Sequence, residues 1–492
     1  MRLFLSLKSL MFFTLGLVLF AASSVAEINQ APPSVESLSS NVVLPDIFSN
    51  GMVIQRGRVF RVWGQAKAGT NIKIEFAGET KQVISQKDRW SLEFAPRELT
   101  AQPLVMNIFA NNQLIRQIVD ILVGEIWLAS GQSNMQMALG GTKEKDAAFQ
   151  RPEDPLLRCF NVPSKDLITK NPPLGTVWQK ASRSAIGNWS AVAYHFAHEL
   201  RKSLQVPIGL VNCSLGATTT EAWCSPELLA QGYPHYEKFY LSMDKSKAPP
   251  YAHPSFCYER MLSTVMPYSI RGILWYQGEG NTGRWQEQER LFPALVQEWR
   301  QKWDNPNMPV YFVQLARFEQ GDWHPFRDAQ RRIWEKLPHS FMAVTIDLPK
   351  DYDPNNHPIH PNTKQPIGER LALAANKLVY GLDIPTFSGP RIKSATFLND
   401  TISLSFDFVG QGLKTSDGQA LRGFSVASAD MKFVMATATV EGDLVQLRGF
   451  GSIEPKWVRY GSEADMGKDK LDVNLSNRDG LPASPFTRII TR

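Results

Sequence analysis

The chain has 492 residues, of which 43% are hydrophobic and 20% charged, and its formal net charge is +6 at pH 7. This composition is that of an ordinary globular protein, and the length exceeds one compact core, so we expect two or three domains. The basic residues are scattered, which argues against a nucleic-acid partner. Four cysteines are too few for a disulfide scaffold in a chain of this length, and the absence of a Cys-x-x-Cys pair argues against structural zinc.

Residues 1–26 are predicted to be a signal peptide that does not belong to the fold. Arg2 and Lys8 precede a short apolar run over residues 10–22, and Ser24-Val25-Ala26 supplies small residues for cleavage. The apolar run is too short for a stable membrane-spanning helix. We therefore expect an exported protein, periplasmic or extracellular, with no membrane segment in its mature form.

The pattern of the remaining chain predicts three regions. Short alternating stretches with turn residues between them predict an N-terminal β-sandwich domain over residues 41–120. Strands then alternate with amphipathic helices over residues 121–385, which predicts an α/β domain with a parallel sheet. Residues 386–492 return to alternation without a helical pattern, and they are predicted to form a second β domain.

The sequence Gly131-Gln132-Ser133-Asn134 follows directly on the apolar run over residues 121–129. A buried parallel strand would place these residues at the carboxyl edge of its sheet, where open α/β folds bind ligands, and glycine permits a sharp turn there. Ser133 would then present its hydroxyl as a nucleophile, and its N–H would be available to a developing oxyanion.

A serine nucleophile needs a base, and histidine is the side chain best suited to exchange a proton near neutral pH. His195 and His198 fall on one predicted amphipathic helix, where they are best interpreted as helix-face residues. His360 differs, because it lies in a loop rich in Pro and Asn after a strand-like stretch over residues 343–347 and before a predicted helix over residues 361–380. His360 is therefore the candidate base.

Ser133 and His360 belong to a set of motifs, namely residues 44–56, 123–135, 212–216 with 221–223, 275–281, 359–361 with 364–365 and 368–371, and 480–486. This set resembles the sialate O-acetylesterase family of SGNH-type hydrolases. The resemblance extends over roughly residues 42 to 488, and the motifs occur in the family's order.

The resemblance implies a flavodoxin-like SGNH-hydrolase core and a serine esterase that needs no cofactor. Ser133 would be the nucleophile and His360 the base of a two-step acyl transfer. The oxyanion donors would be the N–H groups of Ser133 and Gly216 and a side-chain amide of Gln277 or Asn281. The implied substrates are acetylated sugars, with the 9-O-acetyl group of sialic acids as the usual expectation.

The sequence departs from the family at two places. The family often has a second glycine where this chain has Ala217, and a left-handed backbone there would not suit alanine. The family also has an aspartate two or three residues before the histidine, where this chain has Pro358 and His357. The sequence therefore does not identify the acid that orients His360.

Several carboxylates are candidates for that acid. Asp353 is the favoured one, because a turn before the following proline would fix its direction. Asp351 and Asp347 are further candidates upstream, and Glu279 would come from another strand end. Glu279 and Glu221 are also candidate supporting residues, and a backbone carbonyl is the remaining alternative.

His357 and His360 also have a spacing that two metal ligands can adopt. The prolines beside them prevent the regular helix that usually presents such a pair, and no third ligand has an obvious place. We therefore expect no metal at this site.

The substrate is less well determined than the chemistry. The segment over residues 218–268 is rich in aromatic residues and proline. It is interpreted as a packed lid or a helical excursion and also as a wall that stacks on sugar rings, and the two interpretations are compatible. An acetylxylan or other polysaccharide acetylesterase would use the same catalytic residues with a different rim. A non-catalytic carbohydrate-binding protein is a further alternative, and the sequence leaves the oligomeric state open.

Overall fold

The computed structural model describes residues 42–163, 177–242, 252–318, 323–349, 351, 359–462 and 473–492. The predicted signal peptide and three residues of the loop before His360, namely Asp353, His357 and Pro358, lie outside these ranges. Within the described ranges, none of the helices has both the length and the apolar character that a membrane crossing requires. The same ranges contain no group of three His, Cys, Asp or Glu side chains that could hold a metal ion.

The centre of the fold is a sheet with the strand order β13-β12-β11-β7-β10-β8-β9, parallel except for the pair of β8 and β9. Its strands are β7 (Gln113–Gly131), β8 (Asp154–Asn161), β9 (Gln179–Ala181), β10 (Ile208–Ser214), β11 (Gly272–Tyr276), β12 (Val310–Val313) and β13 (Ser340–Ala343). The predicted parallel-sheet α/β core is confirmed, although the sequence pattern did not reveal β8. The strand order reverses at β7, and the carboxyl end beside such a reversal is where open α/β sheets bind ligands.

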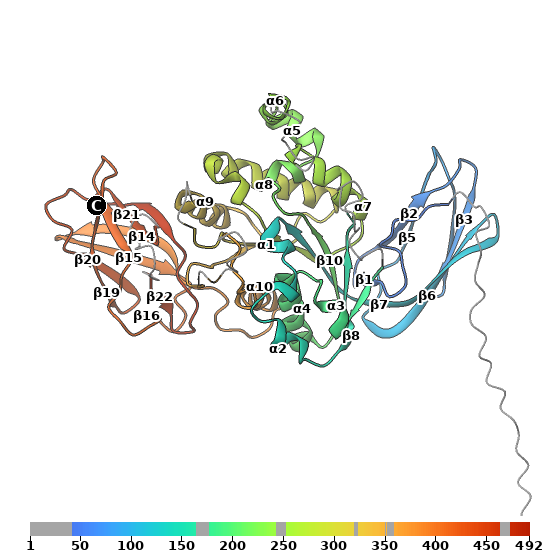
Figure 1. Ribbon diagram of the computed structural model, residues 1–492, viewed down its shortest axis with the longest axis horizontal. Coiled ribbons are helices and arrows are strands. Elements are labelled where there is room, and N and C mark those ends of the chain that lie inside the picture. The colour runs from blue at the N-terminus through green and yellow to red at the C-terminus, as the bar shows by residue number, and fades with distance from the viewer. Residues whose placement is uncertain are drawn as a thin grey trace, which may run out of the picture. The chain divides into compact units, whose positions relative to one another are not determined.

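The longer helices cover both faces of this sheet (Figure 1). They are α4 (Ala191–Leu204), α8 (Trp285–Lys302), α9 (Trp323–Lys336) and α10 (Gln365–Leu378). Helices α4 and α10 pack so closely that a Cβ at Gly368 would lie 2.6 Å from the Cβ of His195. His195 is buried in this contact, and burial lowers its pKa to about 3. The interpretation of His195 as a helix-face residue therefore holds.

The N-terminal region consists of short strands that join the first half of β7. Strands β3 and β4 pair with each other, β6 joins β3 to β7, β1 runs parallel to β7, and β2 pairs with β5. These strands are β1 (Val53–Gln55), β2 (Phe60–Gln65), β3 (Asn71–Phe76), β4 (Glu79–Ile84), β5 (Arg89–Phe94) and β6 (Thr100–Ala110). The predicted domain boundary between residues 120 and 121 thus falls inside β7, which both regions share.

The C-terminal region is built from antiparallel strands, in agreement with the alternating pattern of its sequence. Two four-stranded sheets have the orders β14-β15-β20-β19 and β18-β17-β21-β23, and β16 pairs with β22. The strands are β14 (Arg391–Leu398), β15 (Thr401–Asp407), β16 (Leu413–Thr415), β17 (Phe424–Ala427), β18 (Phe433–Met435), β19 (Thr437–Glu441), β20 (Leu444–Arg448), β21 (Trp457–Tyr460), β22 (Leu475–Asn477) and β23 (Phe486–Ile489).

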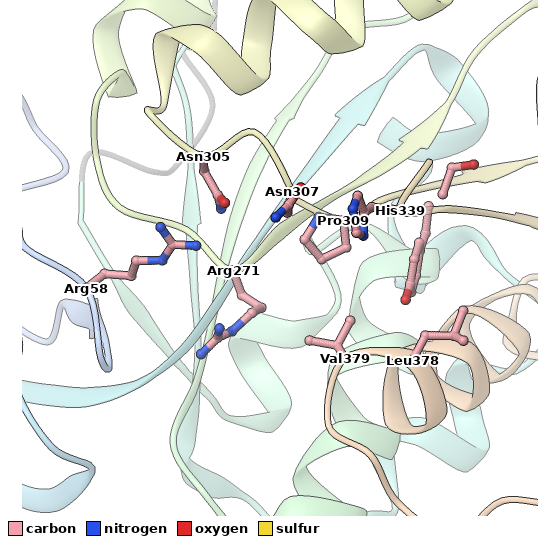
Figure 2. Close-up of a pocket in the computed structure, with 10 residues that line it drawn as sticks. Arg58, Arg271, Asn305, Asn307, Pro309, His339, Leu378 and Val379 are labelled. Atoms are coloured by element: carbon pink, nitrogen blue, oxygen red, sulfur yellow. The ribbon is translucent and has the colours of Figure 1, made fainter. Parts of the chain in front are cut away.

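A pocket of about 440 Å³ lies at the amino ends of the central strands (Figure 2). It is lined by residues that immediately precede strands, such as Arg271 before β11 and His339 before β13, and by Arg58 from the N-terminal region. The Arg271 guanidinium donates to the buried Glu125 carboxylate at 2.6 and 3.0 Å. This pocket is at the opposite edge of the sheet from Ser133, so it is not the site at the end of β7.

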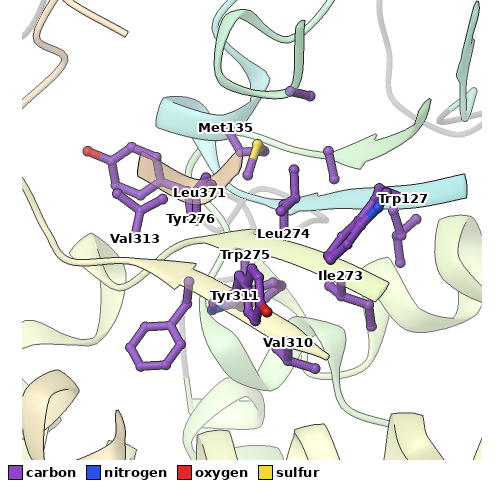
Figure 3. Packing of buried hydrophobic residues seen from close by; sticks show 14 of the residues in the cluster. Trp127, Met135, Ile273, Leu274, Trp275, Tyr276, Val310, Tyr311, Val313 and Leu371 are labelled. Atoms are coloured by element: carbon purple, nitrogen blue, oxygen red, sulfur yellow. The ribbon is translucent and has the colours of Figure 1, made fainter. Parts of the chain in front are cut away.

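Large aromatic side chains fill the core around β7, β11 and β12 (Figure 3). The ring of Trp127 on β7 lies 5.7 Å from that of Tyr311 on β12, and its indole N–H donates to the Tyr380 hydroxyl at 3.0 Å. Trp275 on β11 stacks on Phe292 of α8 at 5.9 Å. Strands β11 and β12 are buried along their whole length, as expected for parallel strands covered on both faces.

Candidate active site

Ser133 and His360 meet at the carboxyl end of β7. Ser133 begins the short helix α1 (Ser133–Gln136), and His360 lies in the loop that leads to α10. The Nε2 atom of His360 is 2.7 Å from the Oγ atom of Ser133, although 227 positions separate the two residues in the sequence. This contact has the geometry that a base needs to take the proton of a serine nucleophile.

The turn into α1 requires glycine at position 131. Gly131 has a φ of 133°, and a Cβ there would lie 2.1 Å from the carbonyl oxygen of Tyr276. The neighbouring strands hold the turn on both sides, because the Gln132 N–H donates to Tyr276 O at 2.9 Å and the Leu215 N–H donates to Gly131 O at 3.0 Å. The predicted sharp turn is therefore present, and it fixes where Ser133 emerges from the sheet.

Two backbone N–H groups lie near the Ser133 hydroxyl. The Ser133 N–H is in the first turn of α1, where helices leave their N–H groups without intrahelical partners. Gly216 follows β10, and a Cβ at this glycine would lie 3.4 Å from the Cβ of Ser133. Its N–H donates to the Oε1 atom of the exposed Gln136 side chain at 2.8 Å. Ala217 has a φ of 61°, so the left-handed conformation occurs where the sequence has no glycine.

Gln277 and Asn281 are part of a buried hydrogen-bond network. The Nε2 atom of Gln277 donates to Asn281 Oδ1 at 2.7 Å and to Thr218 O at 3.3 Å. The Nδ2 atom of Asn281 donates to Glu221 Oε2 at 2.9 Å. These bonds use both N–H groups of the Gln277 amide and one of the two N–H groups of Asn281, and a role of either amide toward the oxyanion stays a prediction.

Glu221 belongs to the same network. Its carboxylate accepts from Asn281 and also from Arg284 at 2.7 Å, and its side chain is buried. The hydroxyl of Thr220 donates to Gln277 Oε1 at 2.6 Å. The network thus fixes the loop after β10 against the turn after β11, which is a structural role at the rim of the site.

The side chain of Asn134, next to the nucleophile, connects three elements. Its Nδ2 atom donates to Glu279 Oε1 at 2.5 Å and to the carbonyl oxygen of Ile359 at 2.9 Å. Its Oδ1 atom accepts from the Nζ atom of Lys364 at 2.6 Å. Neither Asn134 nor Lys364 was predicted from the sequence to have a role. The sequence signal for them is their position: Asn134 directly follows Ser133, and Lys364 lies four residues after His360.

Burial changes the acid–base properties of this group. Lys364 has no exposed surface, and burial lowers the pKa of its ammonium group to about 7, although the carboxylates of Glu279, Glu144 and Asp351 act in the opposite direction. Burial also raises the pKa of Glu279, against the hydrogen bond from Asn134 and the charge of Lys364. The two ionisable groups therefore lie in a desolvated environment next to the reacting residues.

The other described carboxylate candidates have partners of their own. Asp347 accepts from the Arg370 guanidinium at 2.8 and 2.5 Å. Asp351 accepts from the Thr363 hydroxyl at 2.5 Å and pairs with Lys143 at 3.4 Å. These contacts assign Asp347 and Asp351 to the positioning of the segments around the loop, while Asp353 lies outside the described residues.

The aromatic segment beyond β10 is mainly packed in its described part. It contains a 3-10 turn (Thr220–Trp223), α5 (Pro226–Gly232) and α6 (His235–Ser242). Trp223, Tyr233 and Tyr236 are buried, and the Tyr236 hydroxyl donates to Glu287 of α8 at 2.7 Å. These side chains pack the segment onto α8, so they do not form an open wall for sugar rings.

The chain was compared with known proteins. Residues 123–377 match the family described as "Carbohydrate esterase, sialic acid-specific acetylesterase". The sialate O-acetylesterase of Homo sapiens is 31% identical over 386 residues, which cover 70% of this chain and 72% of the human protein. That of Rattus norvegicus is 29% identical over 516 residues, covering 90% and 93%. A crystal structure of a carbohydrate acetylesterase from Xanthomonas citri has a TM-score of 0.78 at 32% identity and covers 91% of this chain and 99% of its own.

Proposed function

This chain belongs to the sialic acid-specific acetylesterase family of carbohydrate esterases, and from that membership and the Ser133–His360 contact we propose that it removes O-acetyl groups from sialic acids. The observation that carries the proposal is the distance of 2.7 Å between His360 Nε2 and Ser133 Oγ at the carboxyl end of β7. The sialate O-acetylesterases to which the chain is similar support sialic acid as the sugar, and the 9-O-acetyl group is the proposed position.

The proposed reaction has an acylation and a deacylation step. His360 Nε2 takes the proton of Ser133 Oγ as this oxygen attacks the acetyl carbonyl carbon. The tetrahedral intermediate collapses when the bond to the sugar oxygen breaks, and the imidazolium gives its proton to that oxygen. Water, deprotonated by His360, then attacks the acetyl-Ser133 ester, and its cleavage releases acetate and returns the proton to Ser133.

The proposed oxyanion donors are the backbone N–H groups of Ser133 and Gly216. The Gly216 N–H donates to the exposed Gln136 side chain, so the acetyl oxygen takes the place of Gln136 Oε1 when the substrate binds. Backbone donors of this kind are fixed before the reaction and therefore stabilise the developing charge without reorganisation. Asp353 remains the proposed acid that orients His360.

Export belongs to the proposal as well. The N-terminal pattern of basic residues, apolar run and small residues supports a signal peptide over residues 1–26. N-terminal sequencing of the secreted or periplasmic protein should begin at or near Glu27. Full-length protein recovered from the cytoplasm would contradict export.

The proposed identity of the substrate is tested by measuring acetate release from two classes of acetylated sugar. We expect the wild-type enzyme to release acetate faster from 9-O-acetylated sialic acid than from acetylated xylan, and a Ser133→Ala variant to release none from either. Faster release from acetylated xylan would overturn the sialic acid assignment but keep the esterase mechanism. Activity on neither sugar, together with activity on a simple acetyl ester, would point to another acetylated sugar.

A further inference from the structure

We propose that Lys364 is a positioning residue for the esterase reaction, acting through Asn134 to hold the turn of Ser133 against the loop of His360. The inference rests on the roles proposed above for Ser133 and His360. It deepens them by naming what keeps the nucleophile and the base, which come from distant parts of the chain, at hydrogen-bond distance.

Lys364 helps to determine the direction of the hydrogen bonds of Asn134. An ammonium group donates hydrogen bonds and cannot accept them. Because Lys364 Nζ lies 2.6 Å from the Asn134 side chain, the atom facing it must be the carbonyl oxygen. The Nδ2 atom is then directed at the opposite side, where it donates to Glu279 Oε1 and to Ile359 O. Without the ammonium group, only the two acceptors on the opposite side, Glu279 Oε1 and Ile359 O, hold the amide in this orientation.

Both ends of this connection are next to the reacting residues. Asn134 directly follows Ser133 in α1, and Ile359 directly precedes His360. The bond from Asn134 to Ile359 therefore joins the peptide that carries the nucleophile to the peptide that carries the base. Misplacement of a reacting group by about 1 Å can lower a rate by about 10²-fold, so this bond is placed where small displacements matter.

The cost of burying an ammonium group supports a role beyond packing. A lysine side chain is almost never fully buried without a reason, because its charge loses its hydration. The charged and aromatic groups that face Lys364 come from several segments: Glu279 after β11, Glu144 before α2 (Lys145–Phe149), Asp351 before the His360 loop, and the Tyr276 ring at 5.5 Å. An apolar residue such as methionine would fill this space without that cost.

The backbone of Lys364 is fixed as well. Its N–H donates to Glu144 Oε1 at 3.1 Å, and the Gln365 N–H approaches the same oxygen at 3.4 Å. The start of α10 is thus held independently of the side chain. Substitution of the side chain therefore tests the ammonium group and leaves this anchor of the loop in place.

The experiment is a double-mutant cycle on kcat with Lys364→Met, Asn134→Ala and the variant that combines them, using 9-O-acetylated sialic acid and a simple aryl acetate as substrates. We expect each single substitution to lower kcat by about 10²-fold with KM changed by less than about threefold. The combined variant should be no slower than Asn134→Ala, since Lys364 acts through Asn134. Losses that multiply in the combined variant would overturn the proposal.

Two further variants separate positioning from folding. Lys364→Met together with Glu279→Gln removes both charges of this pair, while Glu144 keeps its bonds to the backbone N–H groups of Lys364 and Gln365. We therefore expect the fold to be retained and kcat to fall as in Lys364→Met. Lys377→Met on the same helix is the matched control and should leave kcat unchanged. A charge-balanced variant with kcat within about threefold of wild type would contradict the proposal. An active Ser133→Ala enzyme would instead show that the proposed nucleophile is wrong, which distinguishes a failure of the proposed function from a failure of the Lys364 proposal.

Discussion

The side-chain amide of Asn134 donates a hydrogen bond of 2.9 Å to the carbonyl oxygen of Ile359. Each of these residues is the immediate neighbour of a reacting residue, Ser133 in one case and His360 in the other. The contact of 2.7 Å between nucleophile and base is therefore supported by a second, partly buried connection between the same two segments. Active sites whose reacting groups come from distant segments depend on such supporting contacts for their precision.

Replacement of Ser133 by alanine should abolish acetyl ester hydrolysis. The substitution removes the attacking oxygen, and losses of a serine nucleophile in comparable sites reach about 10⁶-fold in kcat. Ser133 is only half-buried, so the fold should be retained, which circular dichroism would verify. Ser130→Ala is the matched control, because this nearby serine on β7 has an Oγ atom without a hydrogen-bond partner among the described residues. A burst of product from the Ser133→Ala enzyme would rule out Ser133 as the nucleophile.

The stability of the protein should depend on pH through Lys364. The pKa of this ammonium group is about 7 in the folded protein, against an ordinary value of 10.5 that the unfolded chain regains. Between these values the unfolded state binds more protons than the folded state, so the contribution of Lys364 makes the free energy of unfolding rise with pH. The slope from one such group is at most about 1.4 kcal/mol per pH unit. Glu279 acts in the opposite direction: because its pKa is raised in the folded protein, its contribution to the free energy of unfolding falls as the pH rises above the ordinary value of 4.5.

Urea unfolding of wild type and of Lys364→Met at several pH values between about 7 and about 10 measures this contribution. We expect the free energy of unfolding of the wild type to increase relative to that of Lys364→Met as the pH rises, because the buried ammonium group of the wild type loses its proton and with it the cost of burying a charge. Parallel pH profiles for the two proteins would show that Lys364 is not desolvated in solution.

Replacement of Ala217 by glycine should stabilise the protein. Ala217 has a φ of 61°, a conformation that costs an L-residue about 1–2 kcal/mol. Glycine avoids this cost, but its larger conformational entropy in the unfolded state offsets part of the gain in stability. We expect a net gain of about 0.5–1 kcal/mol in thermal unfolding. Ala138→Gly in the neighbouring loop is the control, because Ala138 has an ordinary φ of −71° and should lose stability. A loss of stability in both variants would contradict the strain at position 217.

Much of this fold and part of the site follow from local sequence patterns. The apolar runs before Ser133 and before Gln277 predict parallel strands, because a strand buried on both faces has no polar alternation. Ser133 and His360 could be predicted because each follows such a strand. The length of β7 could not be predicted, because its first half pairs with β6 and alternates like a surface strand.

The polar contacts of the site could not be predicted from sequence for a different reason. The amides of Gln277 and Asn281 sit where an oxyanion donor is expected, yet they donate to Thr218 and to Glu221. The direction of a carboxamide depends on which acceptors surround it in three dimensions. The burial of Lys364 is likewise a tertiary property, because the residues that cover it come from several separate segments.

The carboxylate candidates for the acid that orients His360 are distinguished by the effect of their substitution on kcat. Asp347 is bound by Arg370 and Asp351 by Thr363, so Asp347→Asn and Asp351→Asn should lower stability modestly and leave kcat within about threefold of wild type. Asp353→Asn should lower kcat by roughly 10²–10⁴-fold, because a triad acid holds the imidazole tautomer and stabilises the imidazolium. Measurement of kcat for these variants beside Glu279→Gln decides among them. If Asp353→Asn retains wild-type turnover, Asp353 is not the acid, and if all four variants do, His360 is oriented by a backbone carbonyl or by water.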